Sequence, residues 1–370
     1  TAFASSIVNK YGSFASAASS PVVLKVAMFA GAWWLTPHMA EPIMALGWAV
    51  VAAGILQLAI QIPELWNKNL LIPPKVDFKH EGVDRILKLM LPALFGVSVT
   101  QINLLLNTIW ASFMQDGSVS WLYSAERMTE LPLGLIGVAI GTVILPSLSA
   151  RHAEQDQAKF RSMIDWAAKV IMLVGIPASI ALFMLSTPII QALFQRGEFT
   201  VEDTHMTALA LQCMSAGVIS FMLIKVFAPG FYAQQDTKTP VRVGLMAVAA
   251  NAILNVVFIG FFKLIDWQAE HMALALASSG SALVNAGMLY FYLHKRNIYR
   301  FGAHWKKLAL QYSVANLTMI AALWYGLTWY QGDISQWLRI AEVAGLCVIG
   351  VVAYLVGLIA MGFRPRHLKH

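Results

Sequence analysis

Charged residues are scarce in this sequence. Only 12% of its 370 residues are Asp, Glu, Lys or Arg, whereas 58% are hydrophobic and the mean hydropathy is +0.64. Soluble domains carry about 25% charged residues, so the chain has too few charges to cover a soluble protein of this length. Apolar stretches of about 20 residues, enough for a helix to cross a bilayer core of about 30 Å, recur along it. The composition predicts a membrane protein.

Cysteines and catalytic motifs are equally sparse. The two cysteines, Cys213 and Cys347, lie far apart in apolar stretches, which predicts packed thiols rather than a disulfide framework or a metal site. The sequence has no Gly-rich phosphate loop, no HExxH or GxSxG motif and no carboxylate pair at a catalytic spacing. These absences favour a transporter over a membrane-embedded enzyme. An enzyme or a scaffold without transport stays the alternative, which a dry and closed cavity would favour.

Polar breaks divide the chain into one partial and ten full transmembrane helices, an all-α polytopic membrane helix bundle. The partial helix ends near Lys10, and the sequence begins without Met or a signal peptide, which predicts a truncated chain. The ten full helices are expected at 20–36, 43–63, 86–113, 118–149, 163–187, 204–231, 240–262, 270–293, 308–329 and 336–362.

Lys and Arg are unevenly divided between the connectors. Of 26 basic residues, 19 lie in alternate connectors that start with the one after the partial helix, and 3 lie in the opposite connectors, namely Arg196, Lys263 and Arg339. Basic residues favour cytoplasmic loops, so the first set of connectors and the C-terminus are predicted to face the cytoplasm. The same distribution explains the net charge of +7 without a nucleic-acid partner.

One predicted span carries a stripe of polar residues. Arg127 and Glu130 are three residues apart on one helix face, and Ser120 and Ser124 continue that face. A charge at the bilayer centre costs at least about 2.5–3.5 kcal/mol, so such residues usually face a bundle interior or a wet cavity. We interpret the stripe as a cavity wall for an anionic headgroup, because a guanidinium suits a phosphate. The alternative is an ion pair that only fixes helix packing.

Four further features rank below that stripe. Lys225 lies about one turn before Pro229, and Lys25 lies about one turn into its helix. Each lysine is a candidate for substrate binding, with extension to the membrane surface as the alternative. Two asparagine pairs at i, i+4 spacing can supply amide oxygens to a small cation or, alternatively, hydrogen bonds between helices. These pairs are Asn103 with Asn107 and Asn251 with Asn255.

Long motifs in the sequence resemble those of a known family. Residues 117–132 read Gly-Ser-Val-Ser-Trp-Leu-Tyr-Ser-Ala-Glu-Arg-Met-Thr-Glu-Leu-Pro, and residues 225–240 read Lys-Val-Phe-Ala-Pro-Gly-Phe-Tyr-Ala-Gln-Gln-Asp-Thr-Lys-Thr-Pro. Both are similar to motifs of the MurJ (MviN) lipid II flippases, in the multidrug/oligosaccharidyl-lipid/polysaccharide exporter superfamily. The shorter segments 92–98 and 194–200 also match, and the resemblance covers the whole chain.

The resemblance implies a fourteen-helix transporter fold that this chain enters at the fourth helix. Residues 1–149 would hold the end of an N-terminal bundle and the start of a C-terminal bundle, 150–303 the rest of the core C-terminal bundle, and 304–370 two helices that form a groove for a lipid tail. Arg127, Glu130 and Lys225 match cavity positions of the family. Lys25 stands where the family usually has Asn, so its role is a departure from the pattern.

The resemblance further implies that the chain flips lipid II, an undecaprenyl-pyrophosphate-linked disaccharide peptide, from the inner to the outer leaflet of the bacterial inner membrane by alternating access. No cofactor is expected, and a monovalent cation and the membrane potential are the two candidates for coupling, between which the sequence does not decide. The expected partners are lipid II and membrane lipids. The alternative is an exporter of another polyprenyl-linked saccharide or of drugs. A cation-selective drug pump would favour acidic cavity residues, whereas the residues buried in this chain's spans lean basic.

Overall fold

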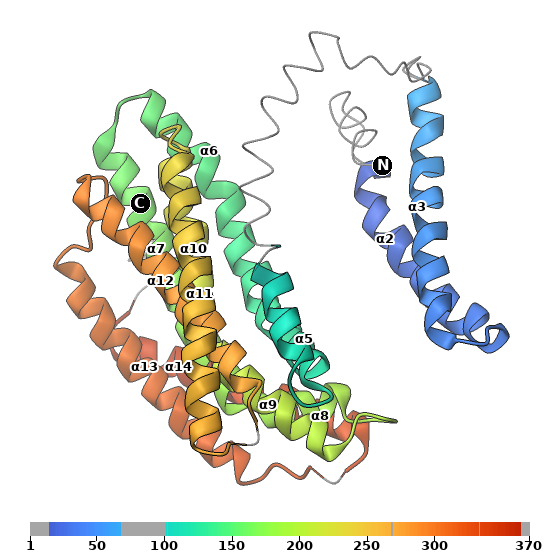
Figure 1. The fold of residues 1–370 in the computed structure, drawn as a ribbon. Coiled ribbons are helices and arrows are strands. Elements are labelled where there is room, and N and C mark those ends of the chain that lie inside the picture. Colours follow the sequence, from blue (N-terminus) through green and yellow to red (C-terminus); the bar gives the residue numbers. More distant parts are fainter. Residues whose placement is uncertain (1–14, 68–100, 102, 268, 333, 364–370) are drawn as a thin grey trace. The chain divides into compact units, whose positions relative to one another are not determined.

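The computed structural model describes residues 15–67, 101, 103–267, 269–332 and 334–363 (Figure 1). Every regular element among these residues is a helix, which confirms the prediction of an all-α chain for this part of it. The chain divides into two compact units, residues 1–88 and residues 89–370.

The first unit is a helical hairpin. Helix α2 (Ala15–Ala30) continues through the π-helical turn η1 (Gly31–Leu35) and the 3-10 turn η2 (Thr36–His38), and α3 (Pro42–Asn67) packs back along it. A Cβ atom at Gly31 would collide with the Cβ of Ala49, so the missing side chain lets the two helices approach closely. Near the other end of α2, the Gln57 amide donates a 2.8 Å hydrogen bond to the carbonyl of Ser20.

The second unit is a bundle of helices with unequal lengths. In chain order these are α5 (Ser118–Pro132), η3 (Leu133–Val138), α6 (Ala139–Ala153), α7 (Gln157–Met184), α8 (Ser186–Phe194), α9 (Val201–Ser215), α10 (Val218–Tyr232), α11 (Lys238–Leu264), α12 (Met272–Lys295), α13 (His304–Leu327) and α14 (Gln336–Ala360). Helix α10 lies against α6, α7 and α12. Its Phe227 and Phe231 are buried in the main apolar core.

The helices differ in detail from the predicted spans. Elements α5, η3 and α6 form one continuous helical stretch, Ser118–Ala153, with a π-helical segment in its middle. The short helix α8 was not predicted. The predicted span 204–231 is divided between α9 and α10, because the chain turns at Gly217. A side chain at Gly217 would collide with Ser279, whose hydroxyl donates to the carbonyl of Cys213 at 2.8 Å and so satisfies the end of α9.

Seven stretches within the described residues are long and apolar enough to cross a membrane. They are Pro42–Trp66, Ser118–Ala153, Gln157–Met184, Val201–Tyr232, Lys238–Leu264, Met272–Lys295 and Gln336–Ala360. The chain is therefore a multi-pass membrane protein. The number of ten full spans and one partial span stays a prediction. The partial helix and much of the span at 86–113 lie outside the described residues, and the helices at the predicted spans 20–36 and 308–329 are not among the seven.

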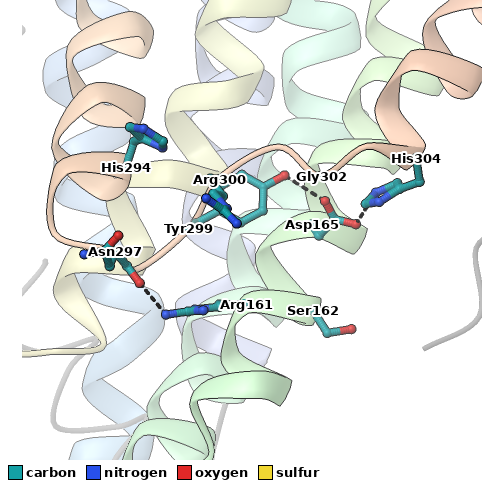
Figure 2. A pocket seen from close by; sticks show the side chains of 9 residues that line it. All are labelled: Arg161, Ser162, Asp165, His294, Asn297, Tyr299, Arg300, Gly302 and His304. Atoms are coloured by element: carbon teal, nitrogen blue, oxygen red, sulfur yellow. Dashed lines mark hydrogen bonds and ion pairs between the residues drawn. The ribbon is translucent and has the colours of Figure 1, made fainter.

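Three of the basic connectors meet at one end of the second unit. The Arg161 guanidinium, at the start of α7, donates a 2.6 Å hydrogen bond to the carbonyl of Asn297, between α12 and α13 (Figure 2). Arg296 in the same connector forms a 2.6 Å ion pair with Asp236, which lies between α10 and α11. The prediction that alternate connectors face the same side of the membrane requires these three connectors to lie at one end of the unit.

The C-terminal end of α14 lies at this end of the bundle too. The Gln311 amide, in the second turn of α13, donates a 2.9 Å hydrogen bond to the carbonyl of Met361. One ion pair and two hydrogen bonds to backbone carbonyls therefore hold the basic connectors and the C-terminal end of α14 at the same end of the bundle.

Candidate functional site

The predicted ion pair forms on the surface of the second unit. Arg127 donates from Nη1 to Oε2 of Glu130 at 2.7 Å, and the two side chains are 50% and 52% exposed. Nη2 of Arg127 also donates to the Tyr123 hydroxyl at 3.3 Å, and the guanidinium lies 5.6 Å from the centre of that ring. We call Ser120, Tyr123, Arg127 and Glu130, all exposed, the α5 face.

The opposite side of α5 fixes the direction of this face. Ala125 and Met128 are buried against α9 and its neighbours, and the Trp121 indole donates a 2.8 Å hydrogen bond to Asp203 at the start of α9. Asp203 itself caps α9 through the backbone amide and hydroxyl of Thr200. The helix cannot turn its charged pair inward without breaking these contacts.

The two predicted serines separate. Ser120 lies on the α5 face, whereas Ser124 is turned inward and buried. Successive residues on a helix differ by about 100° in direction, so Ser120 and Ser124, four residues apart, do not point in quite the same direction. The edge of the exposed face lies between them. Only Ser120 therefore shares the environment of the ion pair.

Lys225 lies beside the same long helical stretch. It is exposed on α10, although its neighbours Val226 and Phe227 are buried. The stem of Lys225 packs against Gly137 and Gly141, where an added Cβ would lie 3.8 Å from it. Gly137 is ten residues after Arg127, which corresponds to about 15 Å along a helix. Arg127 and Lys225 thus lie along one helix at different depths.

Lys25 belongs to the first unit. It is exposed on α2, and no hydrogen bond or ion pair is found for its side chain among the described residues. Its predicted role in substrate binding stays a prediction.

Three of the four predicted asparagines come together in the second unit. Nδ2 of Asn255 lies 3.2 Å from Oδ1 of Asn107 and 3.2 Å from Oδ1 of Asn251, and Asn107 also donates to Ser278 at 3.1 Å. The amide oxygens of Asn255 and Asn103 are buried without a hydrogen-bond partner in the described part of the chain. Buried polar atoms are rarely left in this state, so both oxygens can accept a further ligand.

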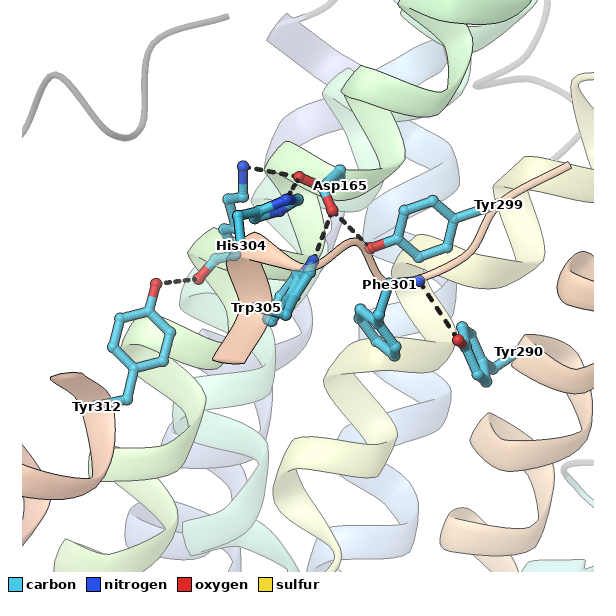
Figure 3. A network of polar contacts seen from close by, with 8 residues as sticks. Asp165, Tyr290, Tyr299, Phe301, His304, Trp305 and Tyr312 are labelled. Atoms are coloured by element: carbon cyan, nitrogen blue, oxygen red, sulfur yellow. Dashed lines mark hydrogen bonds and ion pairs between the residues drawn. The ribbon is translucent and has the colours of Figure 1, made fainter. Parts of the chain in front are cut away.

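Sequence reasoning missed one polar centre, at Asp165 on α7. Its carboxylate accepts hydrogen bonds from the Tyr299 hydroxyl at 2.9 Å, the Trp305 indole at 2.7 Å and Nε2 of His304 at 3.0 Å, and it pairs with Nζ of Lys169 at 2.7 Å (Figure 3). The sequence signal was the i, i+4 spacing of Asp165 and Lys169 within an apolar helix. The three other donors come from the connector after α12 and the start of α13, which sequence spacing does not reveal.

Both cysteines are free thiols. Cys213 is buried, as the prediction of packed thiols requires, whereas Cys347 is exposed, so the prediction is wrong for Cys347. No group of three or more His, Cys, Asp or Glu side chains in the described residues is arranged to hold a metal ion.

Membrane-length helices that carry buried amides and a half-exposed ion pair fit the class of polytopic helical membrane transporters. A family model described as lipid II flippase MurJ matches residues 1–344. The chain belongs to the lipid II flippase MurJ family, which consists of transporters rather than enzymes.

Known relatives agree with this assignment. The chain is 42% identical to the probable lipid II flippase MurJ of Haemophilus influenzae, with 99% of this chain and 72% of the relative covered. It is 41% identical to the probable lipid II flippase MurJ of Vibrio cholerae, with 100% and 69% covered. It is 36% identical to the lipid II flippase MurJ of Burkholderia cenocepacia, with 100% and 72% covered. A solved structure of lipid II flippase MurJ in an inward closed conformation has the same fold, with a TM-score of 0.76 at 24% identity over 96% of this chain and 69% of that one.

Proposed function

We propose that this chain moves lipid II from the inner to the outer leaflet of the bacterial inner membrane, where the peptidoglycan precursor serves cell wall synthesis. The observation that carries the proposal is the match of the flippase family model to residues 1–344. Relatives that are named lipid II flippases, at 36–42% identity, support it. The step is transport, because no covalent bond of the substrate changes.

The α5 face supports a direct role for Arg127 in holding the pyrophosphate. A half-exposed guanidinium in a span is costly against hydrocarbon, so we infer a water-filled chamber in front of it. Glu130 and Tyr123 engage two of the five N–H donors of Arg127 and fix its plane. The remaining donors are left for phosphate oxygens, and the Ser120 hydroxyl lies on the same face.

Lys225 contacts the headgroup at a different depth in the membrane from Arg127. Its stem crosses the helix about 15 Å from Arg127, on the side of the basic connectors, so one pyrophosphate does not bridge both cations. We infer that the phosphates meet Lys225 first and Arg127 later on the way outward. Rocking of helix bundles about this path would open it to each side in turn.

The basic connectors support a cytoplasmic C-terminus. Of the 26 basic residues, 19 belong to the connectors assigned to the cytoplasmic side. The contacts from Arg161 to Asn297 and from Gln311 to Met361 support the assignment, because they join two of these connectors and the end of α14 at one end of the unit. A green fluorescent protein fused after His370 is expected to fluoresce, since it folds inside the cell. A dark but expressed fusion would reverse the assignment.

The asparagine cluster supports a monovalent cation as the coupling ion. Amide oxygens are ligands that hard cations accept, and the oxygen of Asn255 in the cluster lacks a hydrogen-bond partner among the described residues, as does that of Asn103. The three clustered amides carry no net charge, so they suit one positive charge better than two. When bound, the ion would contribute a charge that responds to the membrane potential.

The ion proposal is tested by thermal unfolding at constant ionic strength. Replacing choline by sodium or potassium is expected to raise the melting temperature of the wild type by mass action. Asn255→Leu should abolish that shift, and Ser149→Ala, an exposed change on α6, should leave it intact. An identical melting temperature in all salts would remove the ion site.

The flipping proposal is tested in cells whose own lipid II flippase is depleted. The protein is expected to restore growth and to make lipid II accessible at the outer surface. Arg127→Ala should lower the accessible fraction by roughly 10- to 100-fold, because a hydrogen bond to a charged group contributes about 1.5–3 kcal/mol.

Arg242→Ala is the matched control, since Arg242 is exposed in the first turn of α11 and away from the α5 face. Normal flipping by Arg127→Ala at normal expression would remove Arg127 from the mechanism.

A further inference from the structure

A pocket of about 500 Å³ opens at the basic end of the second unit, away from the α5 face and from the asparagine cluster. Its walls come from the start of α7, the end of α12 and the connector that leads into α13 (Figure 2). They include Arg161, Asp165, His294, Arg300 and His304. None of these residues has a role in the flipping path described above.

The pocket has more positive charge than its own groups neutralise. Arg161 donates to the carbonyl of Asn297, a neutral group, and has further N–H donors left. Arg300 is exposed, and no hydrogen bond or ion pair is found for its side chain among the described residues. The carboxylate in the wall, Asp165, is already engaged by Lys169 and His304. Two guanidinium groups beside one hollow without a carboxylate of their own are an arrangement that suits phosphate.

The Asp165 centre holds this pocket open in a defined shape. Tyr299 and Trp305 both donate to Oδ1 of Asp165, so the connector and the start of α13 are fixed to α7 (Figure 3). Burial and the nearby Asp165 carboxylate raise the pKa of the Tyr299 hydroxyl, which therefore keeps its proton as a donor. The walls are thus organised before any ligand arrives, which lowers the entropic cost of binding.

Aromatic residues place the pocket at the membrane surface. Phe301 stacks on Tyr290 with ring centres 4.7 Å apart and contacts Trp305 edge to face at 4.7 Å. Tryptophan and tyrosine are enriched at the headgroup level of membranes. From there α13 continues along the predicted span at 308–329 with Leu310 and Leu317 exposed, so this helix offers an apolar surface to acyl chains. A phospholipid has acyl chains that can contact this surface, whereas a free anion has none.

We propose that this pocket binds the phosphate of an anionic phospholipid headgroup, with Arg161 and Arg300 as its ligands. The assignment to the cytoplasmic leaflet rests on the proposed orientation of the chain, whereas the binding itself does not. Bound lipid would bridge α7 and the connector before α13, and so steady the junction between the α13–α14 pair and the rest of the bundle.

The test is lipid binding by the purified full chain in neutral detergent, counted by native mass spectrometry with phosphatidylglycerol or phosphatidylcholine at equal concentration. Phosphatidylglycerol is expected to bind about tenfold better, and Arg161→Ala/Arg300→Ala should remove most of that preference, because each charged hydrogen bond contributes roughly tenfold or more. Lys306→Ala/Lys307→Ala is the matched control. It removes the same charge from the exposed start of α13 outside the pocket and should change binding less than about twofold.

Arg300→Ala alone guards against misfolding, because this side chain has no hydrogen bond or ion pair to another described residue. The variant should weaken phosphatidylglycerol binding at an unchanged melting temperature. Equal losses in the two double variants would overturn the pocket in favour of general surface charge. Millimolar inorganic phosphate that binds with the same arginine dependence, without preference between the two lipids, would overturn the lipid assignment. Because transport is not measured, either negative result leaves lipid II flipping untouched.

Discussion

Two helix faces of the second unit are open to the same degree but differ completely in chemistry. The α5 face carries Arg127 and Glu130, each about half exposed. The corresponding stripe on α14, which we call the α14 face, consists of Val348, Val352, Leu355 and Ile359, with exposed fractions of 49–71%. Neither face is covered by another described helix of the unit.

The difference shows that the exposed fraction alone does not tell whether a helix face contacts lipid or water. An exposed valine costs little in hydrocarbon, whereas an exposed charge there costs about 2.5–3.5 kcal/mol or more. The α14 face is therefore suited to acyl chains, and the α5 face to water or a polar ligand. Glycine at positions 350 and 357 lets the other side of α14 lie close to α13, so the apolar stripe is the side left over for lipid.

The largest expected effect comes from moving a charge from one face to the other. Val352→Arg should lower the amount of correctly inserted protein strongly, because the new charge faces hydrocarbon and costs about 2.5–3.5 kcal/mol. Ser120→Arg places the same charge on the α5 face and should remain close to wild type. The measurement is the folded fraction in membranes, by fluorescence-detected size exclusion of a C-terminal fusion.

If the two variants lose insertion equally, the α5 face is in contact with lipid and the chamber in front of Arg127 does not exist. A complementary readout is thiol labelling in a background where Cys213 and Cys347 are replaced by alanine. Ser120→Cys should react with a membrane-impermeant reagent, and Val352→Cys should not.

A smaller effect distinguishes the covered side of α14 from its open side. A Cβ at Gly357 would collide with Thr318 and lie 2.8 Å from Cα of Ala315, so Gly357→Ala forces α13 and α14 apart. Overpacking of this kind costs about 1–3 kcal/mol. Gly345 on the same helix has nothing within 4 Å of an added Cβ, so Gly345→Ala is a matched control with neutral or slightly raised stability. Thermal unfolding in detergent separates them, and equal melting temperatures would contradict the close α13–α14 contact.

Local pattern predicted much of this fold. Long apolar runs placed α3, α11, α12 and α14 within four residues of their observed bounds and α7 within six, because span length is set by the bilayer. The turn at Gly217 and the short helix α8 were not predicted. The turn at Gly217 is stabilised by the Ser279 hydroxyl from α12, and α8 packs against both α9 and α14. Both features therefore depend on tertiary contacts.

The candidate site divides in the same way. The Arg127–Glu130 pair was predictable, since its i, i+3 spacing is a property of one helix. The meeting of Asn107 with Asn251 and Asn255 was not, since it needs two helices that lie more than a hundred residues apart in sequence. Asp165 drew no attention in the sequence because three of its four donors come from the distant segment 299–305.

The smallest expected effect comes from comparing the ion pair on the α5 face with one outside the membrane. Arg296 and Asp236 are 2.6 Å apart, with side chains 46% and 22% exposed. Burial opposes the ionisation of Asp236, but hydrogen bonds from Thr239 and Arg296 outweigh it and lower the pKa of this carboxyl from 3.8 to about 2. Ionised Asp236 therefore stabilises the fold above its ordinary pKa, and the contribution is lost as the pH falls toward 2.

Asp236→Asn should consequently lower the free energy of unfolding by no more than about 1 kcal/mol near neutral pH, as for other partly exposed pairs. The gap between wild type and variant should close between about pH 4 and pH 2, as measured by denaturant unfolding at each pH. Glu130→Gln provides the comparison, because it breaks a pair of nearly equal length on the α5 face. If the α5 face is wet, its cost at neutral pH should be of the same order. A cost several-fold larger would mean that Arg127 was left in a medium of low dielectric. The α5 face would then not be exposed to water, which contradicts the proposed contrast with the α14 face.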